Sequence, residues 1–169
     1  IGQHTSGKKF DLIYCRHVIE HLVAPQRLVR ECAELLTPEG VFVLQCPNGQ
    51  SKEGLLFPHY WLKFLRLTRD SNEWGKTKTF LYSLSRRYGW GIDPPRHLWG
   101  ITGNAIESLF ASDDRYSVKI RTASLADPVF SPYWRPNGRR ERIIGSVNKR
   151  VAGKLFQGMQ LIAEIRRNK

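Results

Sequence analysis

The chain has 169 residues, of which 41% are hydrophobic and 11% are aromatic. This length and composition suit one domain with a buried core over residues 1–169, and they exclude a wholly disordered chain. No apolar run is long enough to span a bilayer, and residues 1–9 have no apolar stretch typical of a signal peptide.

The net charge of +12 is concentrated near the C-terminus. Residues 135–169 contain ten Lys and Arg against two Glu, a balance of +8. Such a segment attracts phosphates, nucleic acid or anionic lipid headgroups. The alternative, which the sequence favours, is an ordinary solvated helix face.

The chain contains three cysteines, Cys15, Cys32 and Cys46, and no CxxC motif. An odd number of widely spaced cysteines suits reduced, buried thiols rather than a disulfide framework. We therefore expect a cytoplasmic protein.

The first 48 residues predict a strand, a helix and a second strand. Residues 10–15 and 41–46 are short apolar runs typical of strands buried on both faces. Between them, Pro25 suits a first helical turn, and residues 37–40 suit a turn in which Gly40 takes a positive φ. The apolar stripe of this helix consists of Leu28, Cys32, Leu35 and Leu36. A right-handed βαβ unit with parallel strands follows from this order.

Residues 49–95 predict a helical insertion that is rich in aromatic side chains. The segment 57–99 holds ten of the chain's 19 aromatic residues. This density indicates a satellite core, an aromatic-lined pocket, or both.

The remaining segments predict two further strands and two helices. Thr102 is positioned to cap a short helix through Phe110, and residues 116–125 alternate as in a half-buried strand. A basic helix is expected over residues 139–156, and residues 159–165 form a last strand.

Two motifs in order resemble a known family. Residues 10–22 (FDLIYCRHVIEHL) and 36–48 (LTPEGVFVLQCPN) are similar to class I S-adenosylmethionine-dependent methyltransferases, in the branch of ubiquinone-biosynthesis and bacterial small-molecule enzymes. Residues 93–99 (DPPRHLW) resemble a third element of that branch. Glu39 stands where a second Gly is usual.

The resemblance implies an α/β fold, specifically the second half of a Rossmann-like methyltransferase domain. We expect a mixed sheet with helices on both faces and a helical, aromatic-rich lid at about residues 49–95. The Gly-rich loop that approaches S-adenosylmethionine lies in the first half of that fold, and Gly2 and Gly7 form no GxGxxG motif. We therefore expect this chain alone to be an inactive fragment of a methyltransferase. The strand at residues 10–15 is expected to expose its edge, which favours a homodimer.

The resemblance also implies a site beyond the carboxyl ends of the strands. Cys15, Arg16, His17 and Val18 would lie beside S-adenosylmethionine. His97 is the expected general base, because an unperturbed imidazole titrates near neutrality. Asn48, Trp61, Arg96 and Trp99 are the residues expected on the side of the small-molecule acceptor. The structural alternatives are a turn role for His17, hydrogen bonds that tie the insertion to the sheet for Arg96 and His97, and lid core for Trp61 and Trp99.

Residues 17–21 (HVIEH) also match an inverted zinc-protease string, but they directly follow a strand, which argues against that chemistry. Some relatives bind a divalent cation through an ExxEH string, of which Glu20 and His21 are retained and His17 replaces the first acid. A transition metal would suit this set better than magnesium. We expect no resident metal, with Glu20 and His21 capping the following helix instead.

Methyl transfer to a small molecule or sugar hydroxyl is the expected function. One alternative is a basic nucleic-acid-binding or RNA-modifying module using residues 135–169, which a closed lid does not favour. The other is a non-catalytic interaction domain.

Overall fold

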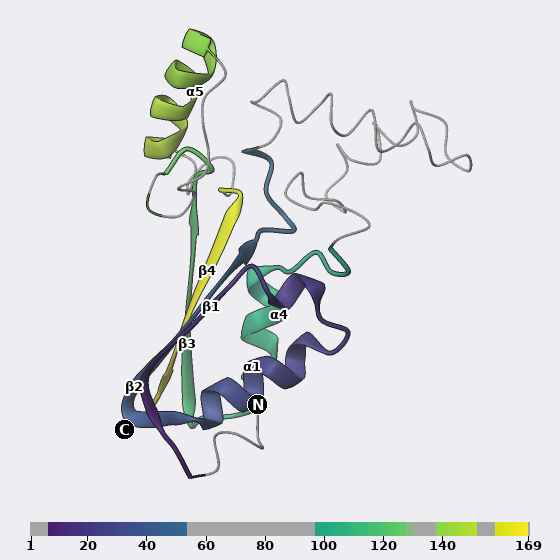
Figure 1. The fold of residues 1–169 in the computed structure, drawn as a ribbon, viewed down its shortest axis with the longest axis vertical. Helices are drawn as coiled ribbons and strands as arrows, with labels where there is room; N and C mark the ends of the chain where they lie inside the picture. Colours follow the sequence, from purple (N-terminus) through teal and green to yellow (C-terminus); the bar gives the residue numbers. More distant parts are fainter. Residues whose placement is uncertain (1–6, 54–96, 128, 130–137, 152–157, 169) are drawn as a thin grey trace, which may run out of the picture.

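The computed structural model describes residues 7–53, 97–127, 129, 138–151 and 158–168. Within this part of the chain, four strands form one sheet in the order β1-β2-β4-β3 (Figure 1). The elements in chain order are β1 (Phe10–Arg16), η1 (Ile19–His21), α1 (Pro25–Glu34), β2 (Leu36–Pro47), α4 (Gly103–Ser108), β3 (Tyr116–Ala123), α5 (Gly138–Val151) and β4 (Gln160–Arg167).

The sheet is mixed. β1 and β2 are parallel and joined through α1, as the strand–helix–strand pattern predicts. β4 lies between β2 and β3 and runs antiparallel to both. The predicted α/β class and mixed sheet are therefore confirmed.

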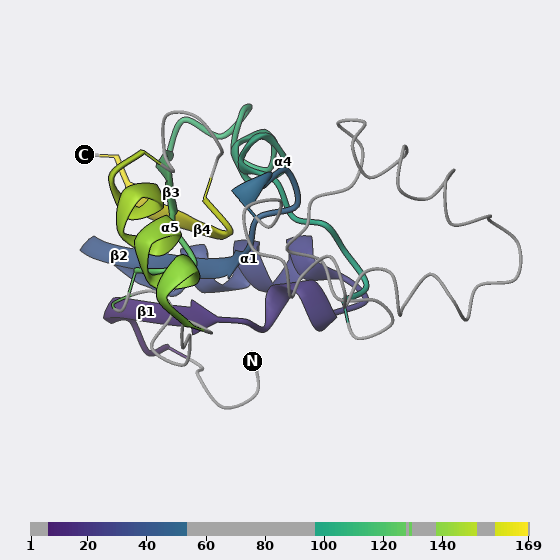
Figure 2. The same cartoon turned by 90° about the horizontal axis from the view of Figure 1, so that it is seen from above.

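The core lies between one face of the sheet and the helices α1 and α4, which lie together on the same side of the strands (Figures 1 and 2). Alternate residues of β2 and β4 supply it, because successive side chains of a strand point to opposite faces. Phe42 and Ile165 are each 0% exposed, and Val29 of α1 packs in the same cluster. On β3 the predicted alternation is confirmed, with Val118 and Ile120 partly buried against this core.

The predicted turn at residues 37–40 is wrong. β2 begins at Leu36 and includes these residues, and the register with β1 shifts between Phe10 and Leu12 to accommodate them. α1 ends at Glu34, so Leu36 belongs to the strand rather than to the helical stripe. Gly40 is not at a positive φ. Its small size is needed instead because a Cβ there would lie 2.7 Å from the Phe10 carbonyl oxygen.

β1 is an edge strand, as expected. Among the described residues it pairs with β2 alone, and Leu12 and Tyr14 are 62% and 55% exposed. Exposed apolar side chains on an edge strand are a ready surface for pairing. A homodimer formed through this edge remains a prediction.

The later elements agree with the sequence in order. The Thr102 hydroxyl accepts a hydrogen bond from the Ala105 amide and caps α4, which ends at Ser108, two residues short of Phe110. α5 begins at Gly138, and residues 152–156 of the predicted basic helix lie outside the described residues. Most of the predicted lid, including Trp61, also lies outside the described residues, and so does Arg96. None of the described helices is long and apolar enough to cross a bilayer.

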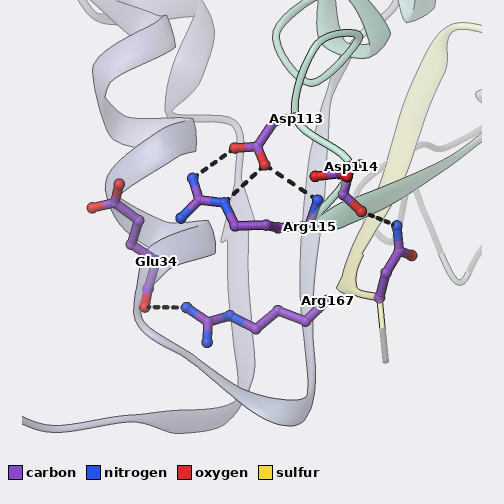
Figure 3. A network of polar contacts seen from close by, with 6 residues as sticks. Glu34, Asp113, Asp114, Arg115 and Arg167 are labelled. Carbon is purple, nitrogen blue, oxygen red and sulfur yellow. Dashed lines mark hydrogen bonds and ion pairs between the residues drawn. The ribbon is translucent and has the colours of Figure 1, made fainter.

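A network of polar contacts lies at the end of the sheet where β3 begins and β4 ends (Figure 3). Asp113 accepts two hydrogen bonds from the Arg115 guanidinium, and these lower the pKa of the Asp113 carboxyl. Arg167 donates to the Glu34 carbonyl at the end of α1, where a cation is favoured by the helix dipole. This network ties α1 to the sheet at the end opposite the carboxyl ends of β1 and β2.

Candidate functional site

A sharp turn follows β1. His17 has φ 51°, which places a non-glycine residue in the left-handed region at a cost of about 1–2 kcal/mol. Its amide donates to the Gln45 carbonyl of β2 at 2.9 Å, and its Nδ1 lies 3.3 Å from Glu20 Oε1. Contacts to a neighbouring strand and to a buried carboxylate hold the strained backbone. Strain of this kind concentrates at functional sites.

Glu20 is the buried acid of the site. Its side chain is 1% exposed, and its Oε1 lies 3.3 Å from His17 Nδ1 and 3.8 Å from His21 Nε2. Burial raises the pKa of this carboxyl, but the His17 hydrogen bond and the two nearby histidines outweigh it, so the pKa is lowered overall. Oε2 is buried and has no hydrogen-bond partner among the described residues. A buried, unpartnered carboxylate oxygen of this kind is a candidate ligand atom for a cation.

The segment 97–99 is fastened to the η1 segment. The Leu98 amide donates to the Glu20 carbonyl at 2.8 Å, and Trp99 Nε1 donates to the Leu22 carbonyl at 2.7 Å. The rings of His21 and His97 meet edge to face, with centroids 5.0 Å apart. Leu22 and Trp99 are 77 residues apart in sequence, so two distant motifs meet in one site.

The ligand atoms of Glu20, His21 and His97 lie within 4.8 Å of one another. One carboxylate and two imidazoles suit a transition metal. The expectation that Glu20 and His21 cap the following helix is wrong. α1 begins after Ala24 without a side-chain cap, and η1 contains both residues. The reason is that the chain makes a short 3₁₀ turn before α1, which carries Glu20 inward.

The residues expected beside the cofactor line the end of β1. Cys15 and Arg16 are half-buried, and Val18 is 41% exposed. Burial, and then the Glu20 carboxylate, raise the pKa of the Cys15 thiol. Cys32 and Cys46 are buried, and burial raises the pKa of Cys32 to about 11. All three cysteines are free, and burial raises the pKa of each thiol, so none is primed as a thiolate nucleophile at neutral pH.

Of the residues expected near the acceptor, the structure describes Asn48 and Trp99. Asn48 is 2% exposed, and its Nδ2 donates to the Gly158 carbonyl while its Oδ1 accepts from the Gln50 amide. Through these bonds Asn48 connects the end of β2 to the residues just before β4. Trp99 is 48% exposed, so its ring remains available at the surface of the site.

Sequence reasoning missed Glu53. Its side chain is 0% exposed, and its carboxylate accepts hydrogen bonds from the Ser124 hydroxyl and from the amides of Leu125 and Met159. It thereby joins the end of β3 and the start of β4 to the segment after β2. Nothing local in the sequence marks Glu53, because all of these donors are 71 or more residues away.

The lowered pKa of Glu20 predicts a pH dependence of stability. A carboxyl whose folded pKa lies below its unfolded value stabilises the fold above the unfolded pKa, and this contribution is lost as pH falls through the folded pKa. Glu20→Gln is therefore expected to cost about 1.5 kcal/mol near neutral pH and progressively less in acid. Urea denaturation at a series of pH values measures this, with exposed Glu107→Gln as the control. A difference that does not change with pH would contradict it.

The chain is similar to known methyltransferases. A family described as "Methyltransferase domain" matches residues 2–112. The ubiquinone biosynthesis O-methyltransferase of Cereibacter sphaeroides is 29% identical over 127 residues, which cover 72% of this chain and 49% of that protein. The protein of the same name from Glaesserella parasuis is 33% identical over 70 residues, covering 38% of this chain and 30% of that protein.

A solved structure of a SAM-dependent methyltransferase from Archaeoglobus fulgidus aligns with 98% of this chain and 62% of its own, at 15% identity and a TM-score of 0.49. The chain spans about half the length of the Cereibacter sphaeroides relative. The domain match covers more than half of this chain and includes the motifs at residues 10–22, 36–48 and 93–99. The chain therefore belongs to the class I S-adenosylmethionine-dependent methyltransferase family.

Proposed function

We propose that the protein to which this chain belongs transfers a methyl group from S-adenosylmethionine to a hydroxyl oxygen of a small molecule. The observation that carries the proposal is the meeting of His97 with the Glu20–His21 turn at the carboxyl end of β1. Ligands of open α/β sheets bind at this end. The names of the relatives, ubiquinone biosynthesis O-methyltransferases, favour an oxygen acceptor.

The residues after β1 fit one wall of a cofactor site. The left-handed turn at His17 leaves Val18 partly exposed beyond the sheet, next to half-buried Arg16. An apolar side chain and an adjacent strand end suit the uncharged portion of a nucleoside ligand. When bound, S-adenosylmethionine supplies an electrophilic methyl group on a sulfonium. Cys15 to Val18 would hold one side of it.

His97 would act as the general base that removes the proton of the acceptor hydroxyl. Its imidazole lies against the His21 ring, on a segment fixed by the Leu98 and Trp99 hydrogen bonds, so the base would be held in place before the acceptor arrives. Exposed Trp99 would pack against the acceptor. The pocket would be completed by Trp61, within the proposed lid at residues 49–95, and by Arg96, just after it. We also propose that the protein acts in the cytoplasm.

A second role for the same cluster is supported by the unpartnered Oε2 of Glu20. A divalent cation held by Glu20, His21 and His97 would neutralise that buried oxygen and could orient the acceptor's oxygens. His97 would then be a ligand and not the base, so the two roles exclude each other. Nucleic-acid binding and a purely non-catalytic role remain the rivals to both.

Cofactor binding by the natural protein tests the proposal. Val18→Asp places a charge on the proposed cofactor wall and is expected to weaken S-adenosylmethionine binding, measured by calorimetry, about tenfold or more. Val23→Asp is the matched control, because Val23 is 84% exposed and lies beyond η1. Natural protein that binds no S-adenosylmethionine would contradict the proposed function and favour the interaction domain. Equal effects of the two substitutions would remove Val18 from the site.

A further inference from the structure

The helix α5 presents two apolar side chains to solvent. Ile143 and Val147 are 56% and 58% exposed, and residues four apart lie on the same helix face. The opposite face carries Glu141 and Gly145, also four apart, and both are buried. α5 therefore packs on the protein through one side and leaves an aliphatic pair on the other.

Arginines surround the aliphatic pair. Arg139 and Arg140 lie one turn before Ile143, one on each side of the line through Ile143 and Val147, and Arg142 lies beside Ile143. All three arginines are exposed. Over its whole length α5 carries five basic residues and one acidic residue, and that acidic residue, Glu141, is on the buried side.

We infer that the outer face of α5 docks on an anionic lipid surface. An interfacial helix places its apolar side chains at the boundary of the acyl chains, while flanking arginines bury their stems and direct their guanidinium groups to lipid phosphates. Ile143 and Val147 between Arg139 and Arg140 match this arrangement. Each basic residue near an anionic membrane contributes further attraction.

The other polyanionic or apolar partners fit this face less well. A nucleic acid would pair with the arginines but would leave Ile143 and Val147 without an apolar partner. A second copy of the chain would bring two rows of arginines together, and like charges repel.

Docking through α5 would also bring the candidate site near the membrane. β2 ends where β4 begins, because Pro47 pairs with Gln160, and α5 lies near this end of the sheet (Figures 1 and 2). A membrane in contact with α5 would therefore lie close to the end of the sheet that carries His17 and Glu20. This placement concerns where the protein acts and does not depend on the proposed reaction.

Vesicle sedimentation tests the inference on the natural protein. We expect the protein to bind phosphatidylcholine vesicles that contain phosphatidylglycerol. Binding to vesicles of phosphatidylcholine alone should be much weaker, and added salt should weaken binding to the anionic vesicles. Ile143→Ser with Val147→Ser should weaken binding about tenfold or more, because the apolar contact is lost. Replacing Arg139, Arg140 and Arg142 by Gln should weaken it about fivefold per residue.

Val23→Ser is the control for the loss of an exposed aliphatic side chain away from α5, and far-UV circular dichroism verifies that each variant folds. Unchanged binding by Val23→Ser together with the two losses supports lipid docking. Absence of binding to anionic vesicles overturns the inference. The inference is also overturned if the serine variant still binds the vesicles and the glutamine variant does not, since charge alone would then explain the binding.

Discussion

Replacing Glu53 by Ala is expected to lower the free energy of unfolding by about 3–5 kcal/mol, the largest stability effect of any single substitution considered. The carboxylate accepts from the Leu125 amide at 2.9 Å and from the Met159 amide at 2.7 Å, and it also accepts from the Ser124 hydroxyl. All of these groups are buried around a fully buried side chain. Removing the acceptor leaves several donors desolvated without a partner, and each such donor costs about 1–3 kcal/mol.

Urea denaturation followed by tryptophan fluorescence measures this loss. Glu53→Gln keeps the shape and one carbonyl oxygen but turns an amide NH₂ toward backbone donors, so it should fall between Ala and wild type. Glu107→Ala removes a carboxylate from the exposed side of α4 and should change stability by less than about 0.5 kcal/mol. Similar small effects for Glu53→Ala and Glu107→Ala would show that Glu53 does not join the strands.

The strands and their order along the chain were predictable because their signals are local. Residues 10–15 and 41–46 are continuous apolar runs, and β3 alternates between polar and apolar residues. The turn predicted at residues 37–40 failed for a related reason. Proline and glycine usually break a strand, but here pairing between β1 and β2 extends the strand through them, and a shift of register absorbs the irregularity.

The site was predictable only in part, because its contacts are distant in sequence. The motif resemblance named His17, His97 and their neighbours, but not the meeting of the His21 and His97 rings, because no local pattern links residues so far apart in the sequence. Asn48 was correctly placed after β2, whereas its burial against Gly158 depends on the start of β4. Glu53 carries no motif, since a single Glu in a polar segment is usually solvated. Its partners become visible only when β3 and β4 are in place.

Replacing His97 by Gln in the natural protein is expected to lower kcat for methyl transfer about 10²- to 10⁴-fold, with a smaller change in KM. Glutamine keeps the size and a hydrogen-bonding end but cannot accept a proton near neutral pH. The variant should therefore lose the rise of activity with pH that an imidazole base produces, and it should regain activity in alkaline buffer, where the acceptor hydroxyl ionises unaided. Leu98→Ala is the control. Leu98 is 54% exposed, and its backbone bond to Glu20 does not depend on its side chain.

The same variant separates the base from the metal ligand, because the two roles respond differently to chelation. A base at His97 predicts that EDTA leaves wild-type activity unchanged and that added Mn²⁺ or Zn²⁺ does not rescue His97→Gln. A ligand at His97 predicts that EDTA abolishes wild-type activity and that excess metal restores part of the activity of the variant, since Glu20 and His21 still supply two ligands. The first pattern supports proton removal by His97, and the second would overturn it. Near-normal kcat for His97→Gln without metal would remove His97 from the chemistry altogether, leaving the T-shaped contact with His21 as a structural clasp between two loops.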